Sequence, residues 1–248
     1  MTTLLFYRDI KALNRDEHKL LRLKPVENSA FASGMHLVPV AGLEFFHAAR
    51  HYPIVFIGGR TDPTPIALLG LEKGHNGYLD DAQQWQPNTY IPAFVRRYPF
   101  VLAQDGAQNF TVCLDAAYEG WNESEGKALF EADGSNSAFL DEMIGFLQNF
   151  TKEMERTRRF VEILKHFDLL EPRSLKLTHR SGNQFVLSDF QAVNEERFLA
   201  LADEQVLELN RHGFLGWVYA HLMSLGNANH LFEHYLATKR QPSNATRH

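Results

Sequence analysis

Apolar residues follow two different patterns along the chain, and the change falls near residue 135. Before it, they gather into short runs of strand length with β-branched or aromatic content, bordered by proline, glycine and other turn residues. The clearest runs are residues 53–57, 65–71, 98–103 and 110–114. We therefore predict that residues 1–135 form a sheet-rich N-terminal part, in which short helices such as residues 45–50 lie between the strands.

After residue 135 the pattern becomes helical. Between residues 139 and 167, apolar side chains recur at spacings of three and four, as in a long amphipathic helix. Two apolar segments then flank Ser181-Gly182-Asn183, which predicts a β-hairpin near residues 174–190. Further helices are expected at 194–202, 204–212 and 215–235, the last with a break near Gly226. The chain is thus predicted to be α+β, with a helical C-terminal part at 136–240 and a frayed polar tail at 241–248.

Composition and charge argue against several classes of protein. The 248 residues contain 25 Lys+Arg and 30 Asp+Glu, a formal net charge of -5 that provides no basic field for a nucleic acid. No stretch approaches the roughly 20 apolar residues that span a bilayer. The first residues meet charge after a short apolar run and lack the pattern of a secretory signal, so we expect a cytoplasmic protein. The single cysteine, Cys113, can form neither an internal disulfide nor a cysteine-rich zinc site.

The segment between residues 85 and 100 is the best candidate for ligand binding, because it places aromatic residues around two adjacent arginines. The candidate residues are Trp85, Tyr90, Arg96, Arg97 and Tyr98. Guanidinium groups pair with carboxylate or phosphate, and aromatic rings stack on planar ligands, so a flavin or a peptide carboxylate would suit the segment. The same pattern also fits aromatic residues that fill the core and arginines that cap a short helix, and the sequence leaves this alternative open.

One segment has the form of a metal site. His230-Leu231-Phe232-Glu233-His234 matches the H-x-x-E-H pattern, in which two histidines on one helix face ligate zinc and the glutamate acts as a base. No acidic residue follows His234, so the downstream carboxylate ligand of such enzymes is missing. The nearest upstream histidine, His221, lies on the opposite side of an unbroken helix, although the break near Gly226 could change that. We therefore favour no metal site and identify no cofactor, with zinc and flavin as the alternatives.

The predicted helix that begins near residue 215 carries a stripe with a large aromatic side chain and few charges. Its members are Leu215, Trp217, Val218, His221 and Leu222. Such a stripe predicts either a surface for a second copy or another protein, or the face that packs on the helix at 139–167. Both interpretations remain open at the level of the sequence.

Several segments together resemble the SapC family of bacterial proteins. They are Val38-Pro39-Val40, Tyr52-Pro53-Ile54-Val55-Phe56, Gly74-His75-Asn76, Arg96-Arg97-Tyr98-Pro99-Phe100 in its place after Trp85, and Gly213-Phe214-Leu215. The family is named for an association with surface-layer genes, and members are also encoded beside flavin-dependent halogenase-like proteins and outer-membrane receptors. The resemblance implies an accessory role in such systems and no established catalytic residues.

This resemblance, together with the lack of a recognisable catalytic set, leads to one functional expectation. We expect a non-enzymatic accessory or binding protein that acts with a partner protein or a planar anionic ligand. One alternative is an enzyme, either a metal-dependent hydrolase built on His230 and His234 or a flavin-linked activity that uses Arg96 and Arg97. A third hypothesis is that the protein is a component of a surface layer.

Overall fold

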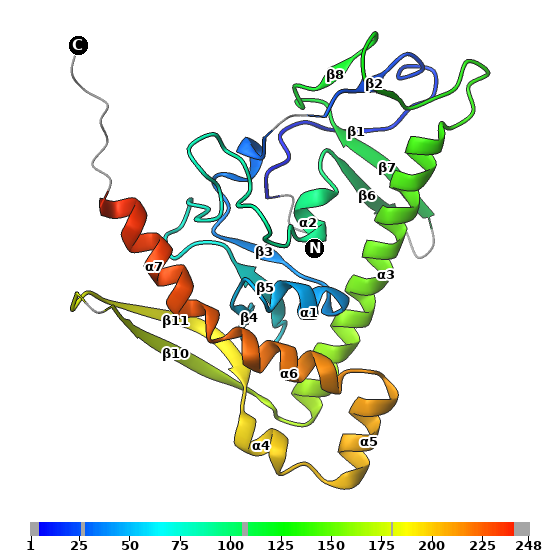
Figure 1. The fold of residues 1–248 in the computed structure, drawn as a ribbon. Helices are drawn as coiled ribbons and strands as arrows, with labels where there is room; N and C mark the ends of the chain where they lie inside the picture. The colour runs from blue at the N-terminus through cyan, green and yellow to red at the C-terminus, as the bar shows by residue number, and fades with distance from the viewer. Residues whose placement is uncertain (1–4, 26–27, 106–108, 180, 241–248) are drawn as a thin grey trace, which may run out of the picture.

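The computed structural model describes residues 5–25, 28–105, 109–179 and 181–240, and the predicted frayed tail at 241–248 lies outside them. Three antiparallel sheets, one long helix and a set of C-terminal helices make an α+β fold, as the sequence predicts (Figure 1). Within the described residues, no helix is both long enough and apolar enough to cross a membrane.

The largest sheet has five strands in the order β10-β11-β4-β5-β3. Its strands are β10 (Leu170–Thr178), β11 (Gln184–Val193), β4 (Ile54–Ile57), β5 (Thr64–Leu68) and β3 (Leu37–Pro39). The first two form the predicted hairpin. Gln191 of β11 pairs with Phe56 of β4, so this sheet combines strands from both sides of residue 135. The N-terminal and C-terminal parts therefore share a sheet and a core.

Two small sheets lie at the other end of the molecule (Figure 1). One has the order β1-β7-β6, and the other has the order β8-β2-β9. Their strands are β1 (Ile10–Ala12), β7 (Asn109–Asp115), β6 (Phe100–Asp105), β8 (Trp121–Asn122), β2 (Arg22–Leu23) and β9 (Lys127–Ala128). They enclose a second, smaller core that includes Phe100, Leu114 and Leu129.

The long helix α3 (Ala138–His166) connects the two cores. Ser137 caps its N-terminus, since the Ser137 hydroxyl accepts a hydrogen bond from the Leu140 amide at 3.2 Å. Leu140 and Leu147 on its first half belong to the small core, whereas Phe160 and Leu164 on its second half belong to the core of the large sheet. One apolar stripe thus packs against two separate groups of strands, which fixes the space between them.

The remaining helices are short. They are η1 (Ala30–Ala32), η2 (Gly42–Glu44), α1 (Phe45–Ala48), α2 (Ala93–Arg96), α4 (Glu195–Leu199), α5 (Asp203–Arg211), α6 (Leu215–Ser224) and α7 (Asn227–Arg240). The predicted break near Gly226 separates α6 from α7. The α6 helix lies very close to η2, because a Cβ atom on Gly42 would come within 2.1 Å of the Trp217 ring. Glycine at this position is what permits the approach.

Candidate functional site

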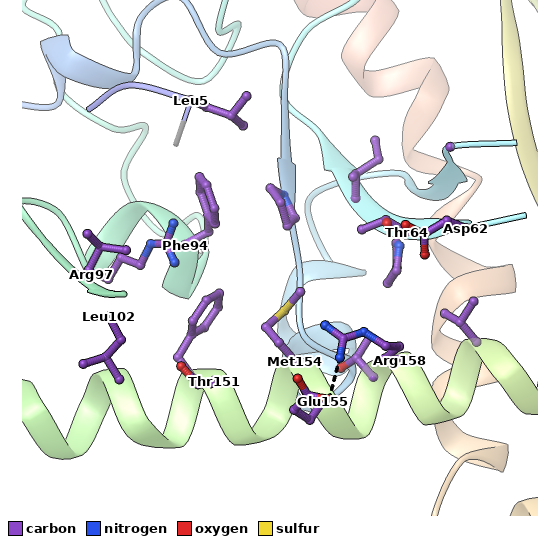
Figure 2. A pocket seen from close by; sticks show the side chains of 18 of the residues that line it. Leu5, Asp62, Thr64, Phe94, Arg97, Leu102, Thr151, Met154, Glu155 and Arg158 are labelled. Carbon is purple, nitrogen blue, oxygen red and sulfur yellow. Dashed lines mark hydrogen bonds and ion pairs between the residues drawn. The ribbon is translucent and has the colours of Figure 1, made fainter. Parts of the chain in front are cut away.

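A cavity of about 940 Å³ lies above α3 (Figure 2). Its floor is formed by α3 residues such as Leu147, Met154 and Val161, and its walls come from the N-terminal segment, α2 and strands of both neighbouring sheets. Most lining side chains are apolar, and only a few are charged or polar. Both the volume and this composition are typical of a small-molecule site.

The arrangement of the sheets explains why the cavity exists. Strand β3 is one edge of the five-stranded sheet, and β6 is one edge of the sheet β1-β7-β6. Both edges contribute to the lining, through Leu37 and Pro39 of β3 and through Val101 and Leu102 of β6. Because α3 packs against each sheet separately, the two edges do not join into one sheet. The cavity is the space between them.

Arg97 is the unusual residue of this cavity. It follows α2 directly, its side chain extends from the end of that helix toward the interior (Figure 2), and only 3% of its surface is exposed. Three aromatic rings surround the guanidinium carbon, with centroids at 4.1 Å for Phe94, 5.2 Å for Phe150 and 5.7 Å for Tyr7. Among the residues that the structure describes, neither Nε nor Nη2 of Arg97 has a hydrogen-bond partner.

Those two nitrogens lie on the same edge of the guanidinium group. This edge presents two parallel N–H groups, which is the geometry that binds a carboxylate or phosphate in a bidentate manner. Buried polar groups in native proteins are nearly always paired, and a buried charge without a partner is strongly unfavourable. Among the described residues, Nε and Nη2 of Arg97 are therefore the buried donor atoms of a charged side chain that lack a hydrogen-bond partner, and Glu153 Oε2 is a buried acceptor atom that also lacks one.

The acidic side chains near this region are already engaged. Asp115, fully buried, accepts hydrogen bonds from the amides of Arg8, Asp9 and Ala117 at 3.0, 2.9 and 3.1 Å. The carboxylate of Glu44 accepts from the Ala93 amide at 2.6 Å and from the Ala41 amide at 3.0 Å. These two carboxylates hold the chain in place and do not neutralise Arg97.

Tyr7 does not supply the missing negative charge either. Its hydroxyl donates to the carbonyl oxygen of Phe100 at 2.6 Å. Burial raises the pKa of Tyr7 to about 12, and the charge of Arg97 and a hydrogen bond between the two side chains only partly oppose that rise. The phenol is consequently neutral at physiological pH. Burial also lowers the pKa of Arg97 from its ordinary value, but a guanidinium group stays protonated in proteins.

Of the five residues of the predicted binding segment, the structure brings Arg96 and Tyr90 together, since Arg96 Nη2 donates to the Tyr90 hydroxyl at 3.2 Å, and gives the others different neighbours. Trp85 is buried and donates its ring N–H to the Tyr52 hydroxyl at 3.0 Å, and Tyr98 donates to Asp115 at 3.3 Å. Tyr90 donates to Glu44 at 2.8 Å, while the exposed Arg96 donates to the Ile91 carbonyl oxygen at 2.9 Å. Of the five, Arg97 alone lines this cavity.

The direction of the two arginines follows from local geometry. Consecutive residues at the end of a helix point about 100° apart, so Arg96 faces solvent when Arg97 faces the cavity. Phe150 and Tyr7, which complete the surroundings of Arg97, are distant in sequence and were not among the predicted site residues. An apolar stripe on α3 is present in the sequence, but nothing local connects it to an arginine before the chain folds.

The histidines of the H-x-x-E-H segment lie on α7 with different neighbours. His230 is exposed, with its Nδ1 3.9 Å from the Glu233 carboxylate, and His234 has its Nδ1 3.5 Å from the Gln86 side-chain nitrogen. His221 is fully buried in α6, where Nε2 accepts from the Val193 amide at 3.0 Å and Nδ1 donates to the Ile54 carbonyl oxygen at 2.9 Å. Both ring nitrogens of His221 are thus occupied.

Within the described part of the chain, no three histidine, cysteine, aspartate or glutamate side chains gather as they would around a metal ion. Burial lowers the pKa of His221 to about 4, so its imidazole is neutral at physiological pH. Both ring nitrogens of His221 are hydrogen-bonded to the backbone of the large sheet, so this histidine has a structural role that connects α6 to that sheet.

The predicted stripe on α6 faces the interior. Trp217 and Val218 are buried, as is His221, and the Trp217 ring lies 5.4 Å from the ring of Phe160 on α3. Leu215 and Leu222 are half-buried against the same core. Of the two interpretations that the sequence leaves open, internal packing describes these five side chains. The opposite face of α6 exposes Tyr219 and Met223.

A comparison with family models gives one match. The model described as SapC matches residues 13–231, which is most of the chain and includes α2, α3 and the residues that line the cavity except Leu5 and Ile10. Neither the curated proteins nor the solved structures include a significant match to this chain.

Proposed function

The chain belongs to the SapC family, and we propose that it is a non-enzymatic binding protein that takes a small organic anion with an apolar body into the cavity above α3. The observation that carries this proposal is Arg97, a buried cation whose Nε and Nη2 atoms have no partner among the described residues. Both atoms have almost no accessible surface, so a carboxylate reaches that edge and completes two charge-assisted hydrogen bonds when a surrounding ring moves aside.

The other lining residues support binding over catalysis. None of the described residues that line the cavity is a histidine, cysteine, serine, lysine or tyrosine. The side chain of Thr157 is engaged, since its hydroxyl donates to the Glu153 carbonyl oxygen at 2.6 Å and accepts from the Gly42 amide at 2.7 Å. A nucleophile paired with a base, the usual basis of covalent catalysis, has no counterpart in this lining.

The three aromatic rings around Arg97 favour an organic anion over an inorganic one. They exclude water from the guanidinium group, and a desolvated site strengthens each charge-assisted hydrogen bond. They also leave the adjoining walls apolar, so a bare phosphate or sulfate would lose its hydration without gaining contacts for its remaining oxygens. A carboxylate attached to a ring or a chain places the charge at Arg97 and the body against the apolar lining.

The experiment is isothermal titration of the purified full chain with naphthoate and with decanoate, each compared with the corresponding alcohol. We expect both carboxylates to bind and both alcohols to bind at least about tenfold more weakly, because only the carboxylate pairs with Arg97. Arg97→Gln should reduce carboxylate affinity by a similar factor. The matched control is Arg96→Gln, which alters the neighbouring, exposed arginine and should leave affinity unchanged. Equal binding by the Arg97 and Arg96 variants would contradict the proposal.

A further inference from the structure

We infer that the ligand of this cavity is elongated and bipolar, with a carboxylate at Arg97 and a hydrogen-bond donor or cationic group at the opposite end, beside Asp62. This inference rests on the proposed function and deepens it, because it assigns a chemical class to the second end of the ligand. We call the two ends of the cavity the Arg97 end and the Asp62 end.

The length of α3 sets the distance between the two ends. Phe150 lies under the Arg97 guanidinium, at 5.2 Å from ring centroid to guanidinium carbon, and Arg158 follows eight residues later on the same cavity floor. Eight residues of α-helix rise about 12 Å. Lys165, farther along α3, donates to the carbonyl oxygen of Thr61 at 2.6 Å, which holds the segment that carries Asp62 over this part of the helix. Figure 2 shows Arg97 and Asp62 on opposite sides of the cavity.

The charges at the two ends differ in sign. At the Asp62 end, Arg158 is engaged in an ion pair with Glu155 at 2.6 Å, and Lys165, which lies outside the lining, donates to the Thr61 carbonyl oxygen at 2.6 Å. Among the described lining residues of this end, the carboxylate of Asp62 is the charge without an ion-pair partner. At the Arg97 end the guanidinium is the unpaired charge. Among the described lining residues, the cavity therefore offers one positive and one negative group without an ion-pair partner, separated along its length, and a ligand with several phosphates would find a single such arginine.

Between the ends the lining is mostly apolar, with Thr151 and Thr157 of α3 as its neutral polar side chains. Met154 lies at the centre of the floor, opposite side chains of β3 and β5 such as Leu37, Pro39 and Ile66 (Figure 2 labels Met154). Methionine adapts its shape to irregular partners, which suits a chain of methylene groups as well as a ring. A ligand that spans from Arg97 to Asp62 must present apolar surface along this middle section.

The test compares four molecules that share a chain of equal length: decanoate, ω-aminodecanoate, sebacate and decylammonium. Titration of the full chain should give the tightest binding for ω-aminodecanoate, then decanoate, then sebacate, with decylammonium weakest. We expect steps of up to about fivefold at the Asp62 end, because Asp62 is exposed and its attraction is screened. Butyrate, which cannot reach past Met154, should bind at least about tenfold more weakly than decanoate because it buries less apolar surface.

Two variants locate the effect. Asp62→Asn should leave decanoate affinity within twofold of the wild type and remove the difference between ω-aminodecanoate and sebacate. Arg97→Gln should weaken all three carboxylates by roughly tenfold and leave decylammonium unchanged. Since Asp62 is exposed, its substitution leaves the fold intact, and thermal unfolding of each variant checks this point.

The titrations distinguish failure of carboxylate binding at Arg97 from failure of the elongated, bipolar ligand. If none of the carboxylates binds, both the proposed function and this inference fail. If the carboxylates bind through Arg97 but butyrate equals decanoate, or sebacate equals ω-aminodecanoate in the wild type, the bipolar and elongated ligand is overturned while the proposed function stands. These comparisons use the wild-type chain, so they do not depend on whether the Arg97 variant folds.

Discussion

His221 and Arg97 are both basic side chains that the fold removes from water, with exposed fractions of 0% and 3%, but the protein surrounds them differently. His221 uses both ring nitrogens in hydrogen bonds to the backbone of two strands, at Val193 of β11 and Ile54 of β4. Arg97 leaves Nε and Nη2 without partners among the described residues and contacts three aromatic rings. The chain therefore buries one basic side chain with both nitrogens hydrogen-bonded and another with two of its nitrogens surrounded by aromatic rings.

The position of His221 explains its pairing. Strands β11 and β4 share one register pair, Gln191 with Phe56, and the imidazole connects the two strands beyond that pair. Ser224, one turn later on α6, accepts from the Ile54 amide at 2.9 Å. The helix thus supplies hydrogen bonds that a longer strand pairing would otherwise make. Buried polar groups that stabilise a fold are usually paired, and this contrast between His221 and Arg97 is the reason we propose a ligand for Arg97.

The largest expected effect on stability comes from removing the hydrogen bonds of His221. His221→Leu fills a similar volume but leaves the Val193 amide and the Ile54 carbonyl group buried and unpaired, so we expect the free energy of unfolding to fall by about 4 kcal/mol. Urea unfolding followed by tryptophan fluorescence measures this change. His230→Leu alters an exposed histidine and should change the same quantity by less than about 0.5 kcal/mol. A small effect of His221→Leu would show that these hydrogen bonds contribute little.

The second effect is a loss of stability in acid. The pKa of His221 is about 4 in the folded protein and near 6.5 when unfolded, so the unfolded chain binds the proton more readily. Stability from this group is complete above pH 6.5 and is lost as the pH falls toward 4, by about 3 kcal/mol in total.

His221→Gln retains a donor and an acceptor but does not titrate, which makes it the control for that pH dependence. His36 and His51, whose pKa values are also lowered by burial, titrate in both proteins. The difference between wild type and variant in unfolding free energy, measured from pH 7 to pH 4, therefore reports His221. Parallel pH profiles for the two proteins would refute the assignment.

The smallest expected effect has the opposite sign. Arg97→Met replaces an unpaired buried cation by an apolar side chain of similar length, so we expect the free energy of unfolding to rise by about 1 kcal/mol. The same variant should lose the carboxylate binding described above. Urea unfolding in the absence of ligand measures the gain, with Arg96→Met as the control at the exposed neighbour. A loss of more than about 1 kcal/mol would assign Arg97 to the fold instead of to a ligand.

Much of the fold could be predicted from local patterns. The stripe at 139–167 became α3, the segments around Gly182 became the hairpin β10-β11, and the break near Gly226 separates α6 from α7. The pairing between β11 and β4 could not be predicted, because it joins residues on both sides of the composition change. A period of two or of 3.6 residues indicates an element, but it carries no information about which distant strand completes the sheet.

The candidate site was predicted in part. The sequence singled out Arg97 together with four neighbours, and it could not distinguish Arg97 from Arg96, since both have the same composition around them. From the sequence, the stripe with Trp217 and His221 fits a partner surface and internal packing equally well. Only the contact between Trp217 and Phe160 decides that those side chains pack inside.

By itself, the sequence determined the longer elements, the α+β class and the resemblance that the SapC family model supports, because periodicity, turn residues and motifs are local properties of the chain, whereas two- and three-residue strands such as β1, β2 and β8 leave no such pattern. The tertiary structure decided which polar groups are paired. Phe94, Phe150 and Tyr7 meet around Arg97 only after α3 has packed against two sheets, and Val193 and Ile54 meet His221 only after β11 has joined β4. Burial without a partner arises from such long-range packing, so no local pattern in the sequence could reveal it.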